Sequence, residues 1–259
     1  MITVSTGELA AWLGQLFWPF VRIGACLMVA PAFSAVGVPV RIRVVLAAAI
    51  ALIVAPLVPP PAAVAPLSAA GVVITLQQVV IGVALGFSLR IIFDAVEIGG
   101  QLIANSMGLS FAFNVDPLHG TETAVLGQLY GILVLLTFLA LDGHLRLIEA
   151  LVSGFRTLPV GQELGTRGLW QLIEWGTQIF GAALAIALPA VAALTIVHLA
   201  FGVMSRAAPQ LNLFAVGFPI SLLLGLLLVL ASLPVVQSTF VRLVGDAFGM
   251  VRSLSGAGV

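Results

Sequence analysis

The sequence predicts an all-α, membrane-associated fold, and three observations support that prediction. Hydrophobic residues make up 61% of the chain and charged residues only 8%, against about a quarter charged in an ordinary soluble domain. Most of the apolar runs are near the ~20 residues with which a helix crosses a ~30 Å hydrocarbon core. They also lack the alternation of apolar and polar residues that is typical of membrane β-barrel strands. We therefore expect membrane-associated helical hairpins.

Six apolar segments along the chain each predict a helix. The proline-rich stretch 58–66 removes backbone donors and fixes φ, so no helix continues through it. The stretch 114–123 is polar and turn-forming. No part of the chain is long enough and charged enough to form a separate soluble domain, so we expect one membrane domain over residues 1–259. The helices are expected at about 9–36, 40–58, 71–98, 124–141, 170–200 and 212–240.

Prolines interrupt several of these segments, among them Pro19, Pro189, Pro219 and Pro234. A proline inside a helix frees a backbone carbonyl that another group must satisfy. Kinked helices are therefore expected. They fit close packing against protein or a lined cavity, but proline is also common in membrane helices without any such role.

Arginine supplies all ten basic residues and is balanced by ten carboxylates, so the net charge is zero. Without a basic field, nucleic-acid binding is disfavoured, and so is recruitment to an anionic membrane surface by overall charge. Arg22 lies inside the first apolar segment, where a charge costs about 2.5–3.5 kcal/mol on insertion scales. We therefore expect Arg22 to face protein or water, as a buried polar or subunit-packing residue.

Two charged clusters follow helical spacing and place opposite charges on adjoining turns. Each cluster fits a structural ion pair near a helix end, and each also fits a proton-relay or ion site. The residues are Arg90, Asp94 and Glu97 in the first cluster and Asp142, Arg146 and Glu149 in the second.

The arginines conflict with ordinary threading through a bilayer. If six segments span, Arg41 and Arg43 place the first loop in the cytoplasm. The fourth loop then lies outside, although it contains Arg146, Arg156 and Arg167. Either one segment does not span, or the chain is not embedded in lipid in the ordinary way.

The sequence offers no convergent set of groups for catalysis or for binding a metal or cofactor. Asp142 and His144 are two residues apart and point to different faces of a helix. His198 and the single cysteine, Cys26, lie alone in apolar stretches and are expected to pack. We therefore expect that the protein is not an enzyme and that it binds no cofactor.

An unusual segment follows the third apolar run. Gln101 and Asn105 lie one helical turn apart, and a glycine-containing apolar stretch comes next. Glycine gives the backbone freedom, and methionine and phenylalanine fill a pore and exclude water. The stretch fits a channel plug, and it also fits a re-entrant or core-packing loop. Its residues are Met107, Gly108, Leu109, Ser110, Phe111, Ala112 and Phe113.

Three stretches resemble the FliR family of flagellar export-gate proteins, whose injectisome relatives are the SctT proteins. They are "MGLSFAFNVDP" (107–117), "LDGHLRLIEALVSGFRTLPVG" (141–161) and "APQLNLFAVGFPISLLLG" (208–225). The opening of the chain, from "MITVSTGELAAW" to "VPVRIRVVLA", is also similar to the family's. The third stretch is the most specific, through Pro209, Gln210, Asn212, Gly217, Phe218 and Pro219.

The resemblance implies a non-enzymatic role in type III protein export, at the inner membrane in the flagellar basal body. FliR-like proteins assemble with FliP and FliQ into a gate for unfolded substrates, with FlhB at its cytoplasmic entrance. The implied fold joins a FliP-like part, about 1–190, to a FliQ-like part, about 191–259. Residues 107–113 are similar to the family's plug loop, except that Asn114 stands where many relatives have a second bulky apolar residue. An injectisome export subunit, a small-solute transporter and an intramembrane enzyme are the alternatives.

Overall fold

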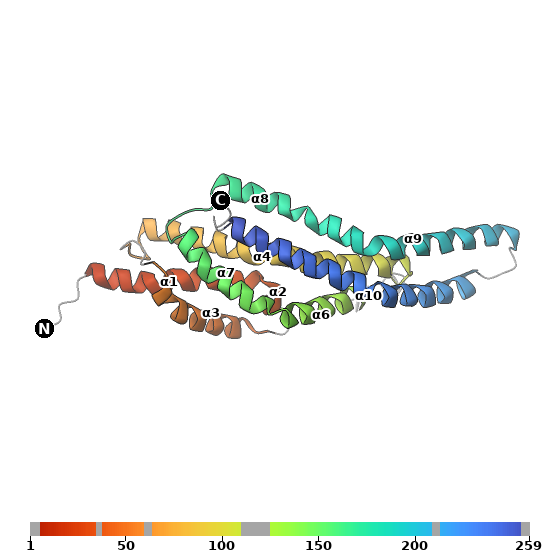
Figure 1. The fold of residues 1–259 in the computed structure, drawn as a ribbon, viewed down its shortest axis with the longest axis horizontal. Helices are drawn as coiled ribbons and strands as arrows, with labels where there is room; N and C mark the ends of the chain where they lie inside the picture. Colours follow the sequence, from red (N-terminus) through yellow and green to blue (C-terminus); the bar gives the residue numbers. More distant parts are fainter. Residues whose placement is uncertain (1–5, 35–37, 60–63, 110–124, 209–212, 255–259) are drawn as a thin grey trace. The chain divides into compact units, whose positions relative to one another are not determined.

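The computed structural model describes residues 6–34, 38–59, 64–109, 125–208 and 213–254, without the side chains of residues 6–13 and 213–216. Within these ranges all regular structure is helical (Figure 1), which confirms the predicted fold class. The helices are α1 (Thr6–Val29), α2 (Pro31–Ser34), α3 (Val40–Val54), a 3-10 turn η1 (Ala55–Leu57), α4 (Ala69–Ser106), α6 (Val125–Ala140), α7 (Gly143–Thr157), α8 (Thr166–Gly176), α9 (Gln178–Ala207) and α10 (Leu213–Leu254).

Four helical stretches in the described part of the chain are long and apolar enough to cross a membrane. A fifth arises if α6 and α7, which are bent by 64° at their junction, count as one broken span. The apolar part of α1 within the described side chains, Gly14–Val29, is shorter. The four stretches are Val40–Leu57, Ala69–Ser106, Thr166–Ala207 and Gly217–Leu254.

The predicted starts of the six segments lie within four residues of helix starts, but four of the predicted ends need larger corrections. The third, fifth and sixth segments continue to Ser106, Ala207 and Leu254 instead of residues 98, 200 and 240. The first segment ends at Val29 instead of residue 36, and Pro31 begins the short α2, a first-turn position in which the missing N–H of proline is tolerated. Pro19, Pro189, Pro219 and Pro234 lie inside α1, α9 and α10 without ending them.

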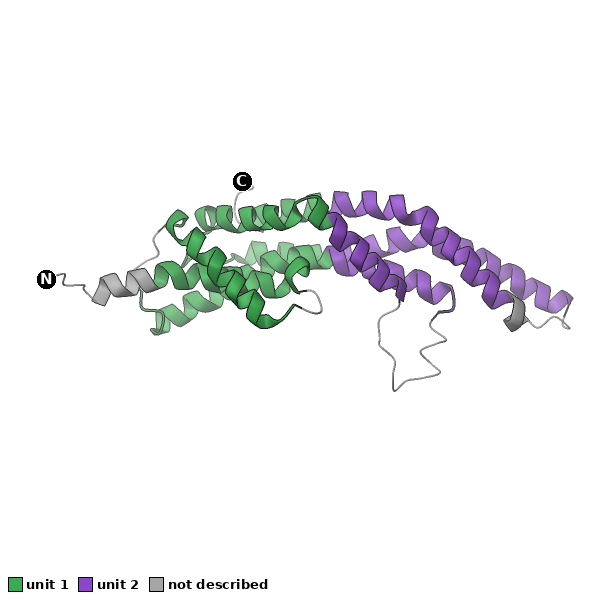
Figure 2. Ribbon diagram, turned by 90° about the horizontal axis from the view of Figure 1, so that it is seen from below, with its two compact units in different colours: residues 1–91, 138–176, 244–259 green, residues 92–137, 177–243 purple. Residues whose placement is uncertain are grey.

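The described residues divide into two compact units (Figure 2). Unit 1 comprises residues 1–91, 138–176 and 244–259, and unit 2 comprises residues 92–137 and 177–243. Both units are discontinuous in sequence, because α4 and α10 each contribute to both. The expected FliP-like and FliQ-like parts divide the chain differently, by sequence likeness, and remain a prediction.

Close packing of α1 against α4 organises unit 1. Gly82 and Gly86 are spaced one turn apart on α4, and a β-carbon on Gly86 would lie 2.7 Å from the carbonyl oxygen of Cys26. Small residues at this spacing let two helix backbones approach closely. Trp175 Nε1 of α8 donates a hydrogen bond of 2.9 Å to the carbonyl oxygen of Ser88, which holds α8 against the same helix.

In unit 2, glycines likewise allow α4 and α6 to pack closely. A β-carbon on Gly100 would lie 2.8 Å from the carbonyl oxygen of Leu126, and one on Gly131 would lie 2.6 Å from Glu97 Oε1. Gly100 on α4 therefore leaves space for the backbone of α6, and Gly131 on α6 leaves space for the Glu97 carboxylate. The rings of Phe93 and Phe240 meet edge to face at 5.2 Å between centroids and join α10 to this core.

Candidate functional site

The end of α4 sets how the chain enters the segment predicted to be a plug. Gly108 has φ +82°. Its N–H donates to Asn105 O (3.1 Å), and the Leu109 N–H donates to Ala104 O (3.1 Å). This pair of bonds around a left-handed residue is a Schellman helix end, a geometry that glycine adopts at little cost. The exit from α4 is therefore fixed by the backbone.

Met107 anchors this helix end on α10. Its side chain is 2% exposed. A β-carbon built on Gly225 would lie 2.7 Å from Sδ and from Cε of Met107 and would also meet its Cγ. The thioether thus occupies a notch that exists only because residue 225 is glycine. Both residues belong to unit 2.

The last turns of α4 have two different faces. Ile103, Ala104 and Met107 are buried, whereas Asn105 is exposed and Gln101 is half-buried. An amide exposed to hydrocarbon leaves its hydrogen-bonding groups unsatisfied at a cost of a few kcal/mol. This face suits water or a polar partner better than lipid. Ser110, Phe111, Ala112 and Phe113 lie outside the described residues.

Arg22 is fully buried in unit 1 and donates hydrogen bonds to three acceptors of the same unit. Its Nε donates to Gln78 Oε1 (2.7 Å), Nη1 to Gly154 O (3.3 Å) and Nη2 to Leu158 O (2.9 Å). The guanidinium carbon also lies 4.1 Å from the ring centroid of Phe155. The cation therefore holds the C-terminal end of α7 against α1 and α4, where carbonyls and the helix dipole favour positive charge.

The charged residues of the two predicted clusters are less buried than Arg22. Asp94 and Glu97 are half-buried, and the exposed members are Arg90, Asp142, Arg146 and Glu149. Arg146 lies over the ring of Phe248, with 4.8 Å between its guanidinium carbon and the ring centroid. Whether either cluster has a functional role remains a prediction.

The residues that carry the family resemblance are only partly described. Pro209, Gln210 and Asn212 lie outside the described residues. Gly217 is buried, and a β-carbon there would lie in ordinary contact, 3.6 Å, with the ring of Phe201. Phe218 and Pro219 are exposed near the start of α10.

The residues considered for chemistry have different surroundings. Cys26 is fully buried. Asp142 has φ +53° and directly precedes α7, and His198 Nε2 lies 3.2 Å from Ser221 Oγ. No group of three histidine, cysteine or carboxylate side chains that could hold a metal ion occurs in the described part of the chain.

Sequence reasoning missed two residues that position these sites, Gln78 and Gly225. The partners lie far away in sequence, since Arg22 and Gln78 are 56 residues apart. Gly225 gave one usable signal, because a glycine in the interior of an apolar helix suggests a close approach by another group.

Comparison with known proteins identifies the family. The family model described as "Bacterial export proteins, family 1" matches residues 13–247. The flagellar biosynthetic protein FliR of Pectobacterium carotovorum subsp. carotovorum is 37% identical over 256 residues, which cover 98% of this chain and 97% of that protein. FliR of Escherichia coli (strain K12) is 37% identical over 255 residues, with the same coverage of 98% and 97%. FliR of Bacillus subtilis (strain 168) is 28% identical over 221 residues, which cover 84% of this chain and 85% of that protein.

These similarities extend over nearly the whole chain and include both compact units. Proteins of this family are non-enzymatic components of protein export. Together with the membrane-length helices, the match places the chain at the inner membrane, in the flagellar basal body. The chain belongs to the FliR family of flagellar export proteins.

Proposed function

We propose that this chain is a gate-forming subunit of flagellar type III export. In this proposal it assembles with FliP and FliQ subunits into a channel for unfolded flagellar proteins, with FlhB at the cytoplasmic entrance. The relatives reported above are flagellar, which favours flagellar over injectisome use.

The observation that carries the proposal is the polar face at the end of α4. Asn105 is exposed and Gln101 half-buried within a membrane-length helix. The opposite face of the same turns is anchored by the buried Met107. An apolar helix that presents amides on one face is suited to line a water-containing passage, because there the amides keep their hydrogen bonds.

Exposed apolar side chains support assembly with other helical subunits. On α9 they recur at positions i, i+3 and i+7 of one helix face: Ile196 is 67% exposed, Leu199 66% and Val203 70%. Partner helices could cover such a stripe as well as lipid does. The prolines Pro189 and Pro219 inside α9 and α10 fit partner helices, because neighbouring subunits can satisfy the carbonyls that they free.

For the plug we propose the segment Met107–Phe113. Met107 and Gly108 form its root, with Met107 fixed on α10 and Gly108 turning the chain out of the helix. The phenylalanines at 111 and 113 supply bulky apolar groups in the sequence that follows. Such side chains close a narrow pore by excluding water from it.

Co-purification tests the assembly. An affinity-tagged copy of the chain, expressed with FliP and FliQ, should elute in a single complex that contains all three proteins. A matched control adds the tag to an unrelated membrane protein of similar size. Elution of the chain as a stable species without FliP and FliQ would overturn the proposal.

A further inference from the structure

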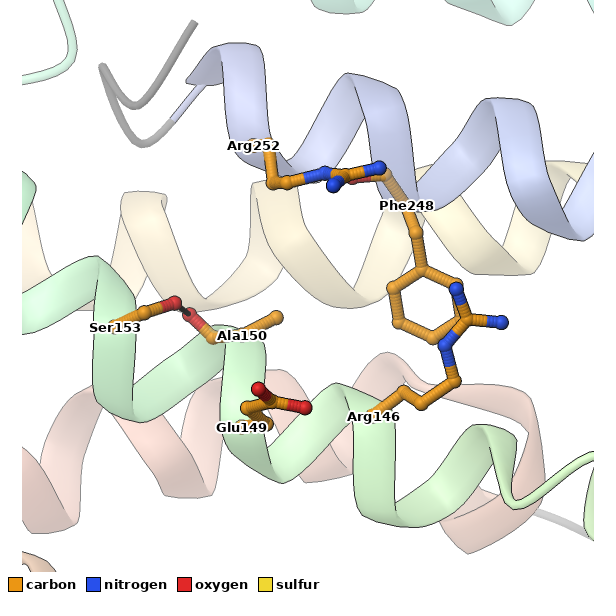
Figure 3. A pocket seen from close by; sticks show the side chains of 6 residues that line it. All are labelled: Arg146, Glu149, Ala150, Ser153, Phe248 and Arg252. Carbon is orange, nitrogen blue, oxygen red and sulfur yellow. Dashed lines mark hydrogen bonds between the residues drawn. The ribbon is translucent and has the colours of Figure 1, made fainter.

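Two arginines from different helices of unit 1 converge on one small cavity (Figure 3). Its volume is about 150 Å³. Helix α7 contributes four residues at positions i, i+3, i+4 and i+7, and α10 contributes two at i and i+4, so each set lies on one helix face. The lining residues are Arg146, Glu149, Ala150, Ser153, Phe248 and Arg252.

Phe248 positions both cations. It is 4% exposed, so its ring is a fixed wall of the cavity. Arg146 lies over the ring at 4.8 Å, and Arg252 Nε donates a hydrogen bond of 3.3 Å to the Phe248 carbonyl oxygen. One guanidinium is thus held by the ring and the other by the backbone of the same residue. This arrangement reduces the freedom that each side chain would lose on binding an anion.

On the α10 side, the cavity lies at the end of a membrane-length helix. Arg252 is in the last turn of α10, which is the end of the 38-residue stretch Gly217–Leu254. Such a stretch is longer than the ~20 residues that cross the hydrocarbon core, so at least one of its ends extends beyond that core. Arg146 follows the 64° bend between the apolar α6 and α7. Helix α7 buries Leu147, Leu151 and Phe155 on one face and exposes charges on the other.

We propose that this cavity binds the phosphate of an anionic phospholipid. The planar guanidinium groups match the geometry of phosphate oxygens, and basic pockets between membrane helices accept acidic head groups. Two arginines and one glutamate leave a net formal charge of +1 in the lining. That charge is complementary to a single phosphodiester. Ala150, with its small side chain, leaves space between the two helices.

Native mass spectrometry of the full chain tests the proposal. The chain is reconstituted in nanodiscs with equal amounts of phosphatidylglycerol and phosphatidylcholine, and the lipids retained after release are counted. The unmodified chain should retain phosphatidylglycerol preferentially. Arg146→Gln and Arg252→Gln should each lower that retention about fivefold, as expected for one arginine near a head group.

Two further variants separate the site from general charge and from misfolding. Arg156→Gln removes an exposed arginine of the same helix that does not line the cavity, and it should leave retention unchanged. Glu149→Gln removes the carboxylate that repels phosphate, so it should raise retention, a gain that a misfolded chain would not give.

Three results would overturn the proposal. The first is no preference for phosphatidylglycerol in the unmodified chain. The second is a loss in Arg156→Gln as large as that in Arg146→Gln, which would indicate a diffuse surface charge. The third is an Arg146-dependent shift with inorganic phosphate or with a partner subunit but not with phosphatidylglycerol, which would assign the cavity to a soluble anion or to a protein carboxylate.

Discussion

The side chain of Met107 occupies the space beside Gly225 in which a β-carbon would have to lie. This contact joins the end of α4 to the first half of α10 within unit 2. A flexible thioether and a missing side chain together make a close fit, and the fit decides where the segment after Met107 starts. Substitutions at Met107 and Gly225 therefore test directly whether this contact fixes the end of α4.

We expect Gly225→Ala to lower the free energy of unfolding by about 1–3 kcal/mol, the usual cost of overpacking. Combining it with Met107→Ala should recover part of that loss, because the smaller side chain frees the notch. Thermal unfolding in detergent measures both. Gly202→Ala on α9, where a β-carbon meets nothing within 4 Å, should be neutral or stabilising. Equal effects at positions 225 and 202 would refute the close fit.

Arg22→Met should lower the free energy of unfolding of the isolated chain by about 3–5 kcal/mol, because it leaves buried acceptors without their donor. The affected acceptors are Gln78 Oε1 and the carbonyls of Gly154 and Leu158. The free energy of unfolding of Arg22→Lys should lie between those of the unmodified chain and Arg22→Met, since an ammonium group cannot reach all three acceptors at once. Urea unfolding in mild detergent gives the values.

Arg156→Met provides the matched control for Arg22, because it removes an exposed arginine from α7. Its effect should stay within about 0.5 kcal/mol. If Arg22→Met were equally mild in the isolated chain and harmful only in the assembled complex, the main acceptor of Arg22 would lie on another subunit.

Gly108→Ala should strain the exit from α4. Its φ of +82° costs a residue with a β-carbon about 1–2 kcal/mol. Gly161 has a similar φ of +94°, and a β-carbon there meets nothing within 4 Å. Gly161→Ala therefore applies the same strain elsewhere. We expect both to lower thermal stability alike, but only Gly108→Ala to change ion leakage through the assembled gate. Ion leakage in both variants would show that the leakage does not depend on the backbone conformation at Gly108.

The fold class followed directly from the sequence, because apolar runs without alternation leave few options besides helices. Helix α7 was harder to recognise. It has no continuous apolar run, and its large buried side chains are Leu147, Leu151 and Phe155, spaced by four residues. Its place after a 64° bend depends on the local geometry at Asp142, whose φ is +53°.

Helix α4 extends beyond the apolar run from which it was predicted. The run was placed at 71–98, but the helix continues to Ser106. Gln101 and Asn105 end the hydrophobic signal without ending the helix, because packing of Gly100 against α6 supports the next turn. The true end signal is Gly108, in the left-handed conformation.

The partners within the candidate sites could not be predicted from local sequence. Arg22 was singled out as a costly charge, but its carbonyl acceptors lie 132 and 136 residues away. Arg146 and Phe248 lie on helices that are distant in sequence, and no spacing rule links them. Such pairs arise from tertiary packing and become visible only in three dimensions.

The central claim is that this chain helps to form a channel and to seal it. The most direct test is ion conductance of the complex with FliP and FliQ, reconstituted in planar bilayers, with and without Met107–Phe113 of this chain. We predict that the unmodified complex stays closed and that the deletion complex, with the same subunits, conducts ions. If the unmodified complex and the deletion complex contained the same subunits and conducted ions equally, the claim would be contradicted.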